Sequence, residues 1–377
     1  MNPIRSNSNL LRHTQRAAFR ISAAGALALA LLLAQSGCQS QQTATADPVT
    51  APDRETESAD TLTQRPVARR VIRRSTLRED AISTLVEQSA SNNAMVRANA
   101  LESLATAGPR LRAPLAAGLV DPNEGVRAIA AVLVGRSEIN ELVPAARSLL
   151  HDESPLVRAS AIYALRANRA EVDPTPLGVF LLESPQPNIR AHAAFLFGEL
   201  GDASAVPLLR QALHEGIRGA TEQQERVMRL QIAEAMVKLG DRSRLEGIRA
   251  ALYPSRPDEL ELAVLAVQIL GRLGDKASMA QLINLSEYKQ GRRGVPAEVR
   301  LAVADAAARM GRKEGWFIGE AYLADPDPLR RSQAALVLGQ TGREDDLPRL
   351  GDLLDDPNSL VRTAAGGAIL TILSPGG

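Results

Sequence analysis

The chain has 377 residues, and its 44 basic side chains nearly balance its 43 acidic ones. This balance, with no large basic face, excludes the electrostatic footprint of a nucleic-acid-binding protein. Apolar residues make up 45% of the chain and aromatic residues only 3%, so the core must consist of Leu, Ala, Val and Ile. Such small side chains favour thin helical layers in which helices approach closely. The only cysteine is Cys38, so a disulfide within the chain is excluded, and the rest of the chain is compatible with an oxidising compartment.

Residues 1–38 have the pattern of an export signal. Four arginines and no acidic residues precede Cys38, and residues 21–34 form a mostly apolar run. That run is short for a membrane span and typical of a signal peptide. Ser36, Gly37 and Cys38 then resemble the lipobox of bacterial lipoproteins, although Gln35 departs from its usual aliphatic residue. The resemblance implies lipidation of Cys38, and Gln39 after it favours the outer membrane. The alternatives are a plain secretory signal or an uncleaved anchor, with Cys38 incidental.

Residues 39–75 are predicted to be a disordered tether. Up to about residue 65 they are Gln, Thr, Ala, Ser, Asp and Pro with almost no large apolar residue. Such a composition cannot bury enough surface to offset the entropy of ordering. The end of the tether carries a basic cluster: Arg69, Arg70, Arg73 and Arg74. These side chains either contact anionic lipid headgroups or lie on a solvated surface.

One phrase is repeated along the rest of the chain, most clearly at residues 189–202. An apolar residue and an arginine open it, small and apolar residues follow at helical spacing, and Leu-Gly-Asp closes it. With the arginine as position zero, the phrase recurs at Arg97, Arg127, Arg158, Arg190, Arg229, Arg300, Arg331 and Arg362, and a ninth copy has Ala263 at that position. The spacing of these copies falls within the range of roughly 20–50 residues that indicates a solenoid. We therefore predict an all-α, right-handed α-solenoid of about nine helix pairs over residues 76–373.

Two further regularities accompany the phrase. Glycines recur eleven residues after position zero, where a left-handed residue can end a helix: Gly201, Gly240, Gly274, Gly311 and Gly342. Aspartates recur six residues before it: Asp121, Asp152, Asp325 and Asp356. A carboxylate in the turn and a guanidinium at the next helix can form charge-assisted hydrogen bonds within or between repeats. We predict a structural ladder of these aspartates with Arg127, Arg158, Arg190, Arg331 and Arg362. The alternative is an acidic or metal-binding row.

These residues resemble the HEAT-like family, in the short form of the repeat found in phycobilisome-lyase-type proteins. The resemblance covers residues 76–373 and implies stacked helix pairs. It leaves the function open, because the same scaffold hosts adaptors, chromophore lyases and metal-dependent hydroxylases.

The residue inventory gives no support to those enzymes. The hydroxylases hold a di-iron centre through several His-Glu pairs, whereas this chain has four histidines and a single such pair, His214-Glu215. The lyases act in the cytoplasm, and an exported chain would not meet their substrates. No nucleophile motif or phosphate-binding loop occurs. We therefore expect no catalysis, metal or cofactor, although scattered Asp and Glu residues could assemble into an acidic site.

The concave face is predicted to bind a partner. Offsets +2, +5 and +9 of the phrase vary freely and are expected to face it. In repeats two to four they give an apolar patch: Ile129, Val132, Tyr163, His192 and Phe195. Exposed apolar patches often mark interaction sites, but close approach of the repeats could instead bury these side chains against each other. In repeats five to seven the same offsets are polar and charged: Glu234, Lys238, Gln268, Arg272, Asp305 and Arg309.

The sequence thus predicts a scaffold or adaptor without catalysis. It would be lipid-anchored in a bacterial cell envelope, facing the periplasm, and would hold another protein or peptide on its concave face. The alternatives are an envelope enzyme with an unrecognised acidic site and a passive spacer.

Overall fold

The computed structural model describes residues 74–254, 259–287, 289–290 and 293–374. The predictions for Cys38 and for residues 39–73 lie outside these ranges. The first described helix begins at Arg74, two residues before the predicted start of the repeats.

Nine helix pairs make up the described chain, which confirms the predicted solenoid. The first helices of the pairs form an outer layer: α3 (Arg74–Gln88), α5 (Arg112–Gly118), α7 (Val143–Ser148), α9 (Thr175–Glu183), α11 (Val206–His214), α13 (Leu245–Ala250), α15 (Met279–Glu287), α17 (Trp316–Tyr322) and α19 (Leu347–Asp352). The second helices, which carry the repeated phrase, form an inner layer: α4 (Ala94–Ser103), α6 (Glu124–Arg136), α8 (Pro155–Ala167), α10 (Pro187–Leu200), α12 (Glu222–Lys238), α14 (Leu260–Leu273), α16 (Ala297–Arg309), α18 (Pro328–Thr341) and α20 (Ser359–Leu373). Single 3-10 turns precede most outer helices.

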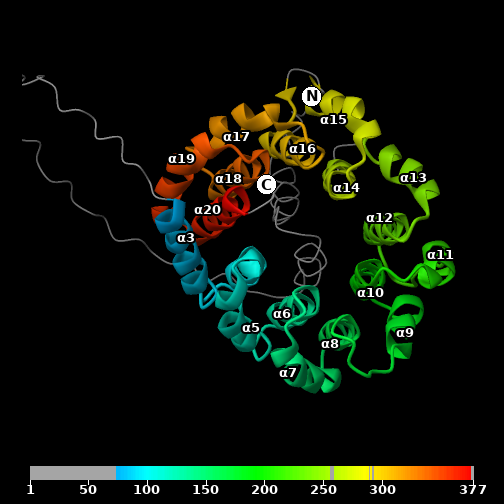
Figure 1. Cartoon of the computed structure of the whole chain (residues 1–377). Helices are drawn as coiled ribbons and strands as arrows, with labels where there is room; N and C mark the ends of the chain where they lie inside the picture. Colours follow the sequence, from blue (N-terminus) through cyan, green and yellow to red (C-terminus); the bar gives the residue numbers. More distant parts are fainter. Residues whose placement is uncertain (1–73, 255–258, 288, 291–292, 375–377) are drawn as a thin grey trace, which may run out of the picture.

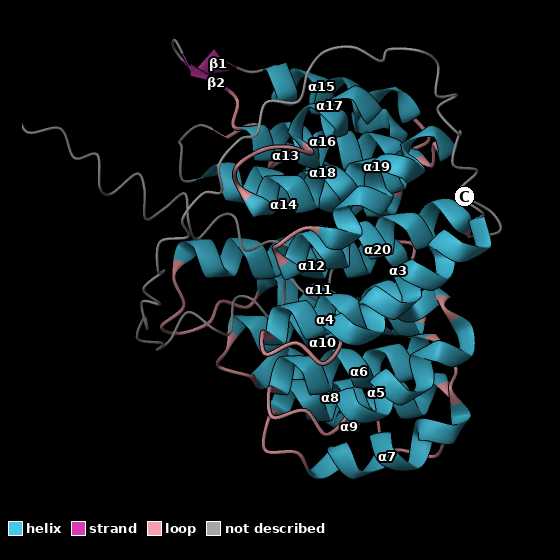
Figure 2. Cartoon of the chain, turned by 90° about the vertical axis from the view of Figure 1, so that its left-hand side faces the viewer, coloured by secondary structure: helices cyan, strands magenta, loops and turns pink. Residues whose placement is uncertain are grey.

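The solenoid closes on itself into a ring, which the sequence analysis did not predict. Figure 1 looks along the axis of the ring, with the inner helices around the centre, and Figure 2 shows the ring from its side. The last helix, α20, packs against both helices of the first repeat, α3 and α4. An ion pair between Arg74 and Glu344, 3.1 Å apart, also joins the first repeat to the last. The two ends of the array therefore bury each other.

Small residues bring the inner helices close together. Glycine recurs eight residues after position zero in four inner helices. A Cβ added to it would lie only 2.7–3.2 Å from the Cα of an alanine in the next inner helix. The pairs are Gly135 and Ala164, Gly198 and Ala235, Gly271 and Ala306, and Gly339 and Ala368. The same close approach seals the ring, because a Cβ on Gly366 of α20 would lie 2.9 Å from Leu85 of α3. Larger residues would widen the inner layer, so these contacts fix the tight curvature.

Each inner helix but the last is followed by a left-handed residue. All five predicted glycines have positive φ angles, and so does Gly108 of the first repeat. In repeats two and three the same position is taken by Glu138 (φ 48°) and Arg169 (φ 58°). The turn therefore keeps its geometry even where the residue has a Cβ and the conformation is strained.

The core lies between the two layers. Offsets +3, +7 and +10 of the phrase point toward the outer helices, as Ile232, Met236 and Leu239 of α12 do where they cluster with Leu209 of α11. Offsets +2, +5 and +9 lie nearly opposite on the same helix, since each residue advances about 100°. They therefore form the wall of the ring's centre.

The long loop of the seventh repeat contains the only strands of the described residues. β1 (Lys289–Gln290) pairs antiparallel with β2 (Arg293–Gly294) before α16 begins. The long loop of the fifth repeat leads into a capping box in which Thr221 and Gln224 start α12.

Candidate functional site

Three arginine–aspartate pairs link neighbouring repeats, two of them between predicted ladder residues and one between Asp121 and Arg97, and we call each pair a rung. Each arginine donates two hydrogen bonds of 2.7–3.0 Å to an aspartate in the next repeat: Arg97 to Asp121, Arg127 to Asp152 and Arg331 to Asp356. Each also donates to the backbone carbonyl six residues before it, and each aspartate accepts from the N–H two residues after it. Bidentate contacts of this kind fix both partners. The rungs therefore have the structural geometry predicted for the ladder.

The other predicted ladder residues do not form this complete geometry. Arg158 and Arg362 donate to backbone carbonyls before their helices, and Arg190 donates to the carbonyl of Ser184. Asp325 lies 3.6 Å from Arg330 rather than in a bidentate pair. The full rung thus occurs at three intervals of 30 or 31 residues between copies of the phrase, but not at the 31-residue interval from Arg300 to Arg331, where Asp325 lies against Arg330.

The predicted apolar patch is not exposed. Its five residues are at most 9% exposed: Ile129, Val132, Tyr163, His192 and Phe195. The imidazole of His192 stacks on the Phe195 ring, with 6.0 Å between the ring centres. The expectation of an exposed patch was wrong because the inner helices lie so close that these side chains fill the space between them. Tyr163, for example, covers Gly135 of the preceding inner helix.

Charged side chains of the inner wall form a series of ion pairs, which we call the charge chain. Arg136 pairs with Glu199 at 2.6 Å, although α8 lies between their helices. Glu199 also pairs with Lys238 at 2.9 Å, and Lys238 lies 3.6 Å from Glu234. The chain continues with two bonds from Arg272 to Glu234 and ends with the pair Asp305–Arg309. The charged offsets of repeats five to seven therefore neutralise each other instead of facing the centre unpaired.

The ion pairs keep the central carboxylates ionised. Burial opposes the charged form of Glu234, but Arg272 and Lys238 hold its pKa below the usual range. The pKa of Glu199 is lowered in the same way, with burial opposed by Lys238 and Arg136. The wall thus combines three carboxylates with four cations and has little net charge.

Glu102 at the +5 position of the first repeat behaves differently. Burial raises its pKa to about 8, and Arg136 opposes that shift only in part. One of its carboxyl oxygens is buried without a hydrogen-bond partner. Glu102 is therefore mostly protonated at neutral pH.

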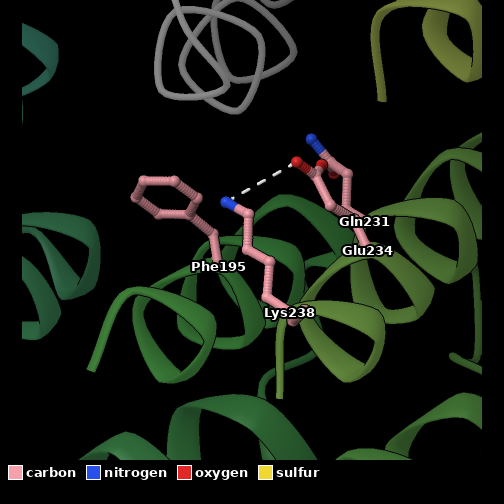
Figure 3. Close-up of a pocket in the computed structure, with 5 residues that line it drawn as sticks. Phe195, Gln231, Glu234 and Lys238 are labelled. Carbon is pink, nitrogen blue, oxygen red and sulfur yellow. Dashed lines mark ion pairs between the residues drawn. The ribbon is translucent and has the colours of Figure 1, made fainter. Parts of the chain in front are cut away.

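A small pocket lies on the charge chain between α10 and α12. It is lined by Phe195, Gln231, Glu234, Ala235 and Lys238, and Figure 3 shows their side chains meeting over these two helices. The ammonium group of Lys238 lies 5.5 Å from the centre of the Phe195 ring. The pocket has a cavity volume of about 10 Å³, which is room for about one water molecule. It is too small to hold a metabolite.

Four neutral side chains of the inner wall carry a buried acceptor atom without a hydrogen-bond partner. All four occupy offset +2 of the phrase, and we call them the acceptor row: Asn99 Oδ1, His192 Nδ1, Gln231 Oε1 and Gln333 Oε1. Asn99, His192 and Gln231 are each more than nine-tenths buried. Unpaired buried polar atoms are rare in folded proteins and call for an explanation.

The contact between Ser160 and His192 does not form a catalytic pair. The Ser160 hydroxyl donates to the carbonyl of Leu156 at 2.9 Å, so its oxygen accepts from Nε2 of His192 at 2.8 Å. Burial lowers the pKa of His192 to about 3, which keeps the imidazole neutral. A hydroxyl whose proton is held by a carbonyl, in a site closed to solvent, cannot be activated as a nucleophile.

The described residues give no sign of a metal site or a membrane span. No group of three or more His, Cys, Asp or Glu side chains within them could hold a metal ion. None of the helices among them is long and apolar enough to cross a bilayer.

Comparison with known proteins identifies the repeats. Residues 290–369 match the model of HEAT repeats, and residues 189–215 match that of the PBS lyase HEAT-like repeat. Two segments of the chain are thus similar to HEAT repeats, one of them to the PBS lyase form of the repeat. No curated protein matches the sequence.

Several solved structures match most of the chain at low sequence identity. Human deoxyhypusine hydroxylase is 18% identical, with a TM-score of 0.32, over 79% of this chain and 98% of that one. The complex of CpcE and CpcF of phycocyanin lyase from Nostoc sp. PCC7120 is 17% identical, with a TM-score of 0.37, over 78% of this chain and 100% of that one. The karyopherin Kap121p bound to the C-terminus of the phosphatase Cdc14p is 12% identical, with a TM-score of 0.34, over 78% of this chain and 42% of that one.

The acceptor row is the feature that sequence reasoning missed. Its members stand at one of the three variable offsets, so their position on the wall was predictable. That their acceptors are buried and unpaired depends on distances between helices, which no spacing in the sequence gives.

Proposed function

We propose that the protein is a scaffold that binds another protein on the inner wall of its ring and performs no catalysis. The observation that carries the proposal is the inner wall of the ring, where charged side chains of several repeats form the charge chain. The side chains of Arg136 and Lys238 are partly exposed on this wall, so they can contact a partner. A passive spacer would not need charged residues at these positions.

The anchoring is part of the same proposal. The apolar run, Ser36, Gly37 and Cys38 support export and lipidation at Cys38, which would hold the ring at the periplasmic face of a bacterial membrane, with the outer membrane favoured. The Cys38→Ala variant should leave the membrane fraction or accumulate as uncleaved precursor. A processed variant that stays with the membranes would show that lipidation is not the anchor.

Partner binding can be tested by crosslinking in the native cells. A photo-crosslinking residue at Gln268 would stand on the inner wall at offset +5, where the native side chain is half-buried. The matched control is the same residue at Gln211, which is exposed on the outer helix α11. We expect another protein to be captured from position 268 and not from position 211. Equal capture from both positions, or none from 268, would refute binding on the inner wall.

An enzyme is the competing function. The buried Ser160–His192 contact does not support it, and the charge chain ties its carboxylates into ion pairs. Turnover of an envelope substrate by the purified protein would replace the scaffold proposal.

A further inference from the structure

The outer layer of repeats six to eight exposes a large apolar side chain on each unit. Tyr253, just after α13, is 65% exposed, Ile283 of α15 is 43% exposed and Phe317 of α17 is 58% exposed. The three helices follow one another around the outside of the ring (Figure 1). All three side chains lie outside the core between the layers, and we call them the outer stripe.

The turns that lead into the same three helices carry cations, and we call them the basic turns. Four of these cations are exposed and form no ion pair within the described chain: Arg242, Lys276, Arg312 and Lys313. Of the acidic residues on these turns, Asp241 and Asp275 are held in ion pairs with other arginines, and Glu314 is exposed. The basic turns therefore keep a net positive charge.

The corresponding turns on the opposite side of the ring have the other sign. The turns into α7, α9 and α11 carry four exposed acidic residues without an ion pair in the described chain: Glu138, Glu171, Asp173 and Asp202. Arg169 is the exposed cation that stands among them. One arc of the ring is thus acidic and the other basic, and the outer stripe lies on the basic arc.

The combination of the outer stripe and the basic turns fits an anionic lipid surface. Each lysine or arginine near such a surface is attracted by the lipid phosphates. Aromatic and aliphatic side chains at the same surface enter the interface between the headgroups and the acyl chains. A protein partner would instead call for a contiguous apolar core in the contact, whereas the members of the outer stripe stand singly on separate units.

We propose that the ring docks on an anionic phospholipid bilayer through the outer face of repeats six to eight. The outer stripe enters the headgroup layer, and the basic turns face the lipid phosphates. This docking goes beyond the scaffold function and does not depend on it. A ring that stands on its outer wall keeps its centre open for a partner, and the proposed anchor at Cys38 would hold it near the same surface.

The single tryptophan of the chain makes this contact measurable. Trp316 lies beside the outer stripe, with its ring edge-on to Phe317 and 6.4 Å between the ring centres. Full-length protein is bound to vesicles of phosphatidylglycerol and phosphatidylcholine that carry bromine on their acyl chains. Attachment through residues 1–38 alone leaves Trp316 away from the acyl chains, so quenching of its emission measures docking. We expect strong quenching that is lost in vesicles of phosphatidylcholine alone and reduced at about 0.5 M salt, where charges are screened.

Two variants with equally exposed side chains make the test specific. Ile283→Ser removes one member of the outer stripe from a different helix than Trp316, and the ratio of docked to undocked rings should fall about tenfold. Val179→Ser is the matched control, because Val179 is also 43% exposed but belongs to α9 on the acidic arc. It should leave quenching unchanged. Lys276→Gln should lower the ratio about fivefold, the factor expected for one basic residue at an anionic surface.

The proposal is overturned if Trp316 is not quenched, if vesicles without anionic lipid quench it equally, or if the serine variants at positions 283 and 179 behave alike. Photo-crosslinking of an acidic protein from position 283, without quenching by vesicles, would assign the outer stripe to a protein and refute docking on lipid. Capture from position 268 without quenching would keep the scaffold function and refute the docking, and quenching without that capture would do the reverse.

Discussion

The rungs and the charge chain are both sets of ion pairs, but they are built on different rules. Each rung joins residues 24 or 25 positions apart with the same bonds, and each belongs to a repeat of regular length. The pairs of the charge chain join residues from 4 to 63 positions apart, and most of them lie where the intervals between repeats are long. A rung depends on the local period of the sequence, whereas the charge chain depends on the curvature of the inner layer. Regular repeats therefore secure their stacking at the turns, and the irregular repeats pair their charges across the inner wall.

Breaking one rung should have the largest effect on stability. Asp152→Ala leaves the Arg127 guanidinium, which is 13% exposed in the rung, without its carboxylate. Removal of one partner of a largely buried pair costs about 3–5 kcal/mol, measured by urea-induced unfolding followed by circular dichroism. Lys238→Ala is the matched change in the charge chain. It should cost less than about 1 kcal/mol, because Glu199 keeps Arg136 and Glu234 keeps Arg272. Equal losses would remove the distinction between the two sets.

The next largest effect is the loss of stability at alkaline pH, which is expected from Glu102 on the inner wall and not from the rungs. The raised pKa of Glu102, about 8, means that the folded protein holds a proton that the unfolded chain releases near pH 4.5. The stabilisation that the protonated Glu102 gives the folded state is therefore complete below the unfolded pKa, and it is lost as pH rises through the folded pKa. Between pH 6 and pH 8 the contribution of Glu102 to the free energy of unfolding should fall by about 2 kcal/mol, and Glu102→Gln should abolish this fall. The rung at Asp152 has a lowered carboxyl pKa and should contribute equally throughout this range. A slope that persists in Glu102→Gln would assign it to another group.

At acidic pH the effect of His192 on stability should become measurable in the Glu102→Gln variant. Burial lowers the pKa of His192 to about 3, so the unfolded chain takes up a proton near pH 6.5 that the folded ring excludes. Stability is then lost as pH falls below 6.5, by about 2 kcal/mol between pH 7 and pH 5. Adding His192→Gln should remove this loss. In the unmodified protein Glu102 gains stability over the same interval and hides the effect, so wild type alone should show a nearly flat profile from pH 6.5 to pH 5.

The smallest effect is expected at the left-handed turns of the regular repeats. Glu138→Gly and Arg169→Gly should each raise the free energy of unfolding by about 0.5–1 kcal/mol, since a residue with a Cβ is strained at positive φ. Thermal unfolding would detect the gain, and Gly201→Ala in the fourth repeat should give a loss of similar size. A loss in the two glycine variants would mean that Glu138 or Arg169 contributes an interaction larger than the strain.

The repeat phrase made most of the fold predictable. Its period located the nine inner helices, and its glycines located five of the eight left-handed turns. The remaining left-handed turns at positions 108, 138 and 169 follow from the register, since each stands eleven residues after an arginine. The site was less predictable. The offsets of Phe195 and Lys238 from the repeated arginine predicted that both lie on the inner side of their helices. Whether a side chain on that wall is exposed depends on how closely the helices pack. The glycines at offset +8 hold that information, since they indicate close neighbours and hence burial of Tyr163 and its patch.

The closed ring also limits how this protein can change in evolution. An open solenoid can gain or lose a repeat at small cost, because each unit contacts only its neighbours. Here nine units close the ring, and the contact of α20 with α3 and α4 joins the last unit to the first. Duplication or deletion of one unit would separate Gly366 from Leu85 and expose two apolar ends at once. Insertions and deletions are therefore expected in loops such as those in the fifth and seventh repeats. The number of repeats itself is fixed by the closure of the ring.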